Sequence, residues 1–66
     1  MRVLQIGCGN FGLAHLAGWS RVGLEASLAV ADPRPDLAAL VAAHAPAARA
    51  VADWRAALAE ADLVDL

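Results

Sequence analysis

Apolar and polar positions divide the chain into segments that are typical of the strands and helices of an α/β domain. Residues 2–6 form a nearly continuous apolar run, which predicts a central parallel strand that is covered on both faces. A second apolar run at residues 24–31, clearest at 27–31, predicts another buried strand. Between these runs, residues 10–21 repeat apolar side chains every three to four positions, which predicts an amphipathic helix. We expect its sheet-facing side to hold Gly12, Leu16 and Trp19.

Turn-forming residues delimit these segments. Asn10 is expected to cap the first helix, and Gly23 follows at a position where glycine ends helices. Residues 35–45 predict a second helix with a proline in its first turn and Pro46 after its end. The expected buried face of this second helix comprises Leu37, Leu40, Val41 and His44.

The last third of the chain repeats the same alternation. We expect a short strand at residues 49–51, a helix at 54–61 that is capped by Asp53, and a further strand that begins near Leu63. Strands that alternate with helices through short links predict a parallel sheet with right-handed crossovers. The predicted fold class is therefore α/β, a partial, Rossmann-like doubly wound sheet of order 3-2-1-4 in three α/β/α layers. The sheet-facing side of the last helix should hold Trp54, Ala57, Leu58 and Ala61.

Size and charge narrow the possible partners. With 66 residues the chain forms at most one small domain, and its net charge of −2 without a basic patch argues against a nucleic-acid partner. A single cysteine excludes an internal disulfide and suits a reducing, cytoplasmic location. No apolar run approaches the ~20 residues that span a membrane, so we expect no membrane partner. No cluster of metal ligands appears in the sequence, and we expect no metal.

The residues with the clearest chemistry follow the first strand and open the first helix. Gly7, Cys8, Gly9, Asn10, Phe11 and Gly12 form a G-x-G-x-x-G pattern. Gly7 can make the turn out of the strand, Gly9 leaves room for a pyrophosphate, and Gly12 lets helix and strand approach closely. Free N–H groups and the positive end of the helix dipole would then attract the phosphates. The alternative is a glycine-rich turn that binds nothing.

An acidic residue at the end of the second strand supports dinucleotide binding. Asp32 lies twenty residues after Gly12, where a carboxylate can accept hydrogen bonds from the adenosine ribose. This carboxylate would also repel a 2′-phosphate, so the expected cofactor is NAD, with NADP as the less favoured possibility. Arg34 could pair with a 2′-phosphate, stack on adenine, or be a solvated turn residue. Asp32 itself could instead serve only to stabilise its turn.

Other reactive side chains have simpler interpretations. Cys8 sits where a thiol can become acidic, although a small packing residue is the favoured interpretation. His15 is interpreted as a packed or capping residue, and His44 as a partner for the negative end of its helix. The chain has no lysine and no tyrosine, so we assign no catalytic residue and expect a proton donor beyond Leu66.

Three stretches together resemble one family of enzymes. Residues 7–15, the strand end at 29–33 and the helix start at 53–58 resemble the glucose–fructose oxidoreductase, inositol dehydrogenase and MocA-like family, with its pattern G-x-G-x-x-G-x-x-H. The resemblance implies an NAD(P)-dependent oxidoreductase that moves a hydride to or from a sugar, polyol or related hydroxylated small molecule. In that family the loop glycines with Asn10 and Phe11 line the pyrophosphate, and Asp32 would hold the ribose.

The resemblance also concerns what lies outside these residues. The chain ends within a strand pattern, so we expect residues 1–66 to be the N-terminal part of a dinucleotide-binding domain. The family's Glu-Lys-Pro segment and its substrate domain, which usually forms homo-oligomers, would then follow. Two alternatives remain open: a regulatory NAD-binding sensor domain without catalysis, and, less favoured, a methyltransferase that binds S-adenosylmethionine.

Overall fold

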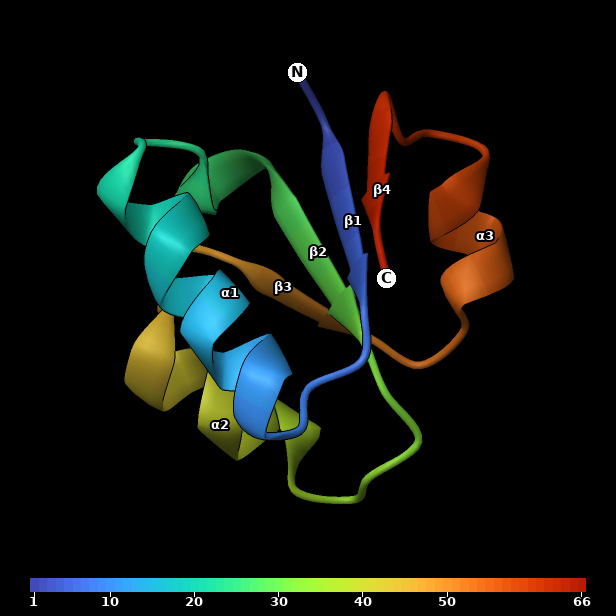
Figure 1. Ribbon diagram of the computed structural model, residues 1–66. Helices are drawn as coiled ribbons and strands as arrows, with labels where there is room; N and C mark the ends of the chain where they lie inside the picture. Colours follow the sequence, from blue (N-terminus) through green and yellow to red (C-terminus); the bar gives the residue numbers. More distant parts are fainter.

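A computed structural model describes residues 1–66 and shows a parallel sheet with helices on both of its faces (Figure 1). The strands lie side by side in the order β3-β2-β1-β4, and every neighbouring pair is parallel. The α/β class and this strand order are therefore confirmed. The strands are β1 (Val3–Ile6), β2 (Leu28–Ala31), β3 (Arg49–Val51) and β4 (Leu63–Asp65), and the helices are α1 (Asn10–Arg21), α2 (Leu37–His44) and α3 (Trp54–Leu58).

The two central strands are buried on both faces, as their apolar runs predict. Val3, Leu4 and Gln5 of β1 are each at most 2 % exposed, and all four residues of β2 are buried. Successive side chains of a strand point to opposite faces. Val3 accordingly packs with the α1–α2 side of the core, while Leu4 packs with the α3 side.

Each face of the sheet has its own apolar cluster, so the elements form three layers (Figure 1). On one face, Leu16 of α1 and Leu37 and Val41 of α2 cover β1 and β2. On the other, the small side chains Ala57 and Ala61 pack against the sheet. Alanine allows the short helix α3 to lie close to the strands, but it buries little apolar area there.

The predicted beginnings of two helices need correction. Gly9, not Asn10, occupies the N-cap position of α1, and no side chain caps that end. Helix α2 begins at Leu37, two residues after Pro35, because residues 33–36 form a turn in which the Arg34 N–H donates to the Asp32 carboxylate. The predicted cap of α3 is confirmed, since the Asp53 carboxylate accepts from the Arg55 N–H at 2.9 Å.

Parts of the predicted buried faces are wrong, and the second strand lies within its predicted range but is shorter. His44 is exposed, and fully buried Ala45 takes its place against the core. Trp54 and Leu58 are 36 % and 42 % exposed, because α3 ends at Leu58 and only its alanine side reaches the sheet. Strand β2 starts at Leu28, after a 3₁₀ turn at residues 25–27.

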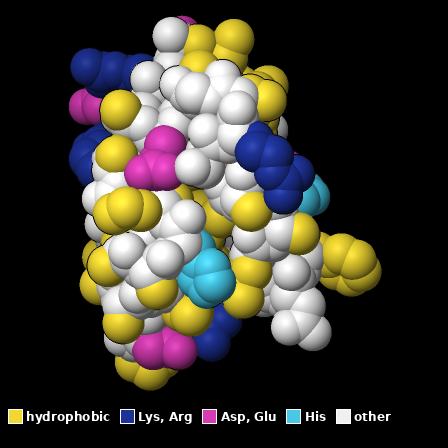
Figure 2. Space-filling model, turned by 90° about the vertical axis from the view of Figure 1, so that its left-hand side faces the viewer, with side chains coloured by type: hydrophobic (Ala, Val, Ile, Leu, Met, Phe, Trp, Pro, Cys, Tyr) yellow, Lys and Arg dark blue, Asp and Glu magenta, His cyan; other side chains and the backbone are white.

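The α1–α2 face carries charges of both signs. Figure 2 shows arginine and acidic side chains dispersed among apolar ones on this face, without a patch of one sign.

None of the three α-helices has the length and apolar character that crossing a bilayer requires.

Candidate functional site

The loop between β1 and α1 depends on two of its glycines. Gly7 has a φ of +106°, a conformation that L side chains rarely adopt, and its N–H donates to the carbonyl of Ala31 at 2.8 Å. A Cβ on Gly12 would lie 2.6 Å from the Gly7 carbonyl oxygen. The loop therefore folds back on the start of α1, as the glycine spacing predicts.

The open end of α1 presents backbone donors that the protein does not use. The first hydrogen bond of the helix runs from the Leu13 N–H to the Gly9 carbonyl at 2.9 Å. The N–H groups of residues 9–12 donate no hydrogen bond within the protein. Gly9 and Asn10 are exposed, and the Phe11 side chain is 86 % exposed. This helix end therefore offers unused donors and the positive end of a dipole to any anion that approaches it.

A buried glutamine of β1 supports the loop, a role that was not predicted from the sequence. Gln5 is 1 % exposed, and its Nε2 donates to the carbonyls of Gly7 at 2.9 Å and Gly12 at 2.8 Å. Its Oε1 is buried and has no partner. The available signal was a lone polar residue within an apolar strand that leads directly into the glycine loop.

Asp32 lies beside the loop, as its sequence position predicts. Its Oδ2 accepts from the Cys8 N–H at 2.8 Å, and its Oδ1 accepts from the Arg34 N–H at 2.9 Å. The carboxylate thus binds the loop and stabilises its own turn, as the alternative interpretation predicts, while its role toward a ribose stays a prediction. A carboxylate has about four acceptor positions. Each oxygen therefore keeps capacity for a further hydrogen bond.

Arg34 also binds the backbone of Cys8, at its carbonyl. Its Nη1 donates to the Cys8 carbonyl at 2.7 Å, while Nε and Nη2 donate to the two carboxylate oxygens of Asp36 at 2.6 and 3.1 Å. Hydrogen bonding to Asp36 raises the pKa of Arg34, and the same contact lowers the pKa of the Asp36 carboxyl. Asp36 was also missed, because an acidic residue before a helix is common and its partner depends on the turn.

Cys8 is a packing residue in this structure. Its side chain is fully buried in the core that α1 and α2 cover. Burial raises the pKa of the thiol, and the nearby Asp32 carboxylate raises it further. A thiol in this environment stays protonated, so the contribution of Cys8 to the site is its backbone.

Two hollows flank the contact between the loop and Asp32. One, of about 250 Å³, borders Gly7, Gly9 and Gly12 on the side of β1 that faces β4. The other, of about 280 Å³, lies at the ends of β2 and β3 and includes Asp32 and Val51 in its walls. Because the strand order is β3-β2-β1-β4, these hollows lie on opposite sides of the loop.

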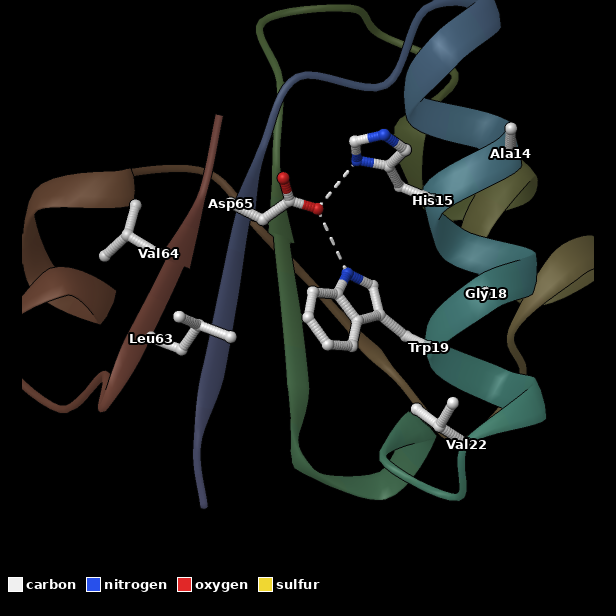
Figure 3. Close-up of a pocket in the computed structure, with 8 residues that line it drawn as sticks. All are labelled: Ala14, His15, Gly18, Trp19, Val22, Leu63, Val64 and Asp65. Atoms are coloured by element: carbon white, nitrogen blue, oxygen red, sulfur yellow. Dashed lines mark hydrogen bonds and ion pairs between the residues drawn. The ribbon is translucent and has the colours of Figure 1, made fainter.

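The largest hollow, of about 440 Å³, lies elsewhere, between α1 and the edge strand β4 (Figure 3). Asp65 Oδ2 contacts His15 Nδ1 at 2.8 Å and accepts from Trp19 Nε1 at 3.2 Å. The tautomer of His15 with a hydrogen on Nδ1 can donate this bond to the carboxylate. His15 thus links α1 to β4, but it is exposed and is not the packed residue that the sequence predicts. No three His, Cys, Asp or Glu side chains gather in a way that could hold a metal ion.

Comparisons of the chain with protein-family models, curated proteins and solved structures give no match.

Proposed function

We propose that this chain is the NAD-binding part of an oxidoreductase and that its sheet is part of a Rossmann-type fold. One observation carries the proposal: the unused N–H groups of residues 9–12 stand at an open helix end, next to a carboxylate on the neighbouring strand. A dinucleotide needs both features at once, since its pyrophosphate is anionic and its adenosine ribose donates hydroxyl hydrogen bonds.

The residues present fit such a cofactor. A Cβ built on Gly9 meets no atom within 4 Å, so the mouth of the loop is open where a phosphate would approach the backbone. Asp32 keeps acceptor capacity for the ribose hydroxyls on both oxygens. The hollow bordered by Arg34 and Leu37 lies on the far side of Asp32 from the loop and suits an adenine ring.

The residues of this site have different roles in the proposed binding of NAD. The amides of residues 9–12 bind the pyrophosphate, Asp32 orients the adenosine, and Gln5 keeps the loop in shape through the carbonyls of Gly7 and Gly12. When bound, the nicotinamide ring supplies the hydride acceptor or donor of the reaction. A sugar, polyol or related hydroxylated compound as the substrate, and a homo-oligomeric assembly, follow from the sequence resemblance alone.

Titration of the isotope-labelled chain with NAD tests the proposal. We expect amide signals of residues 9–12 and of Cys8 to shift in proportion to bound ligand, with signals near Trp54 unchanged. The matched variant is Gly9→Val, because the space around Gly9 lets the variant fold while its side chain fills the phosphate's approach. Binding should then be lost while the circular-dichroism spectrum stays that of the wild type.

Two results would contradict the proposal. In one, NAD shifts no loop signal at any concentration. In the other, Gly9→Val folds normally and binds NAD as tightly as the wild type, which would place the ligand away from the loop.

A further inference from the structure

Each nitrogen of the Arg34 guanidinium already donates one hydrogen bond within the protein. One nitrogen, Nη1, is bonded to the Cys8 carbonyl, and the other two form a fork onto both oxygens of Asp36. Charge-assisted, two-point contacts of this kind are the stronger ones that arginine makes. A phosphate could bind this guanidinium through the two-point Nε–Nη2 edge only by displacing the Asp36 carboxylate.

The guanidinium is nevertheless close to where the ribose would lie. Asp32 accepts from the N–H of Cys8 while Arg34 donates to the carbonyl of the same residue, so the two side chains bind the backbone of one residue. A 2′-phosphate on a ribose at Asp32 would come within the influence of Arg34. It would also meet the negative charges of both Asp32 and Asp36.

We propose that Asp36 is a specificity-determining residue that makes the chain select NAD over NADP by holding Arg34 away from a 2′-phosphate. This inference rests on the proposed function and extends it. Asp36 acts through Arg34 and does not itself touch the nucleotide. The side chains of Asp32, Arg34 and Asp36 together carry a net charge of −1, and removal of the Asp36 charge makes this group neutral.

The size of the effect is limited by solvent. The side chains of Arg34 and Asp36 are 36 % and 54 % exposed, so their attraction is partly screened. Removal of one negative charge and release of a guanidinium fork to a phosphate should together change the relative affinity about tenfold.

Asp36→Asn is the variant that isolates this role. Asn suits the N-cap position of α2, where the Asp36 side chain caps nothing and its carbonyl accepts from the Leu40 N–H at 3.1 Å. We expect the variant to fold and to bind NADP about tenfold more tightly relative to NAD than the wild type does. Calorimetric titrations with NAD, NADP, AMP and 2′,5′-ADP should give the same change in ratio for both ligand pairs.

Two further variants separate this mechanism from a general charge effect. Glu60→Gln removes the same charge from the exposed Arg2–Glu60 pair, whose 2.9 Å contact lies at the opposite end of the strands, and should leave the ratio unchanged. The double variant Arg34→Ala/Asp36→Asn should lose the gain, since no guanidinium remains to receive the phosphate.

The outcomes distinguish the two proposals. If the wild type binds neither dinucleotide, the proposed function fails and this inference with it. If the wild type binds NAD but Asp36→Asn keeps the wild-type ratio, or Glu60→Gln changes it equally, the role of Asp36 is overturned while NAD binding stands.

Discussion

Replacement of Gly12 by alanine tests the most tightly packed point of the loop. The added Cβ would lie 2.6 Å from the Gly7 carbonyl oxygen, 3.0 Å from its carbon and 3.2 Å from Gln5 Nε2. Two of these atoms belong to the backbone and cannot rotate away. The start of α1 must therefore move away from β1, and the hydrogen bonds of Gln5 to Gly7 and Gly12 must stretch.

The expected loss follows from three contributions. Overpacking typically destabilises by about 1–3 kcal/mol. A weakened hydrogen bond of the buried Gln5 amide adds about 1 kcal/mol, and alanine in place of glycine within a helix returns at most about 1 kcal/mol. The net destabilisation is about 1–3 kcal/mol, a large part of the ~3–5 kcal/mol that a chain of this size possesses.

Gly18→Ala is the matched control, since Gly18 lies in the same helix and a Cβ there meets no atom within 4 Å. It should stabilise the chain by about 0.5–1 kcal/mol through helix propensity alone. Urea unfolding, monitored by circular dichroism, measures the free energy of unfolding of each variant. If Gly12→Ala unfolded at the same urea concentration as Gly18→Ala, the close approach of α1 to β1 would be refuted.

Two further predictions concern titratable groups. The Cys8 thiol is buried and its pKa is raised, so it should react with iodoacetamide more slowly in the native chain than in urea. An opening of the structure that costs ~3 kcal/mol slows the reaction about 100-fold. Equal rates would contradict the burial of Cys8. Hydrogen bonds from the Ser20 hydroxyl, which has the larger effect, and from the Ala47 N–H lower the pKa of Glu25. The ionised Glu25 side chain therefore stabilises the folded chain above the ordinary glutamate pKa. This stabilisation is lost as the pH falls through the lower pKa of the folded state. The urea midpoints of wild type and Glu25→Ala should therefore differ at neutral pH and converge in acid; a difference that stays constant with pH would refute this.

Much of the fold could be predicted because hydrophobic periodicity and turn residues agree with each other along this chain. The strand order follows from alternating strands and helices, and Gly23 ends α1 with a φ of +79° as a helix-ending glycine should. Helix limits were less accurate near Pro35, where a side-chain hydrogen bond extends the turn. Propensity contains no information about such a bond.

The candidate site was predictable where backbone register decides it and unpredictable where side chains do. The proximity of Asp32 to the loop follows from parallel strands of matched length. The two-point pairing of Arg34 with Asp36, and the support that Gln5 gives, depend on the conformations of particular turns. The burial of Gln5 follows from its place in an apolar strand, but no spacing rule predicts the partners that these polar side chains bind.

Register also explains why the loop and the carboxylate belong together. Ile6 pairs with Ala31, so the residues that follow them, Gly7 and Asp32, leave the sheet at the same edge. A slip of one residue between β1 and β2 would turn the side chains of β2 to the opposite face of the sheet. The Gly7 N–H bond to Ala31 and the Cys8 N–H bond to Asp32 oppose that slip on successive residues. The contacts that fix the register of β1 and β2 are thus the contacts that position the proposed cofactor site. In the proposed complex, a ribose hydroxyl would use the free acceptor positions of Asp32 without breaking either bond, whereas a 2′-phosphate would find the two-point edge of Arg34 occupied by Asp36.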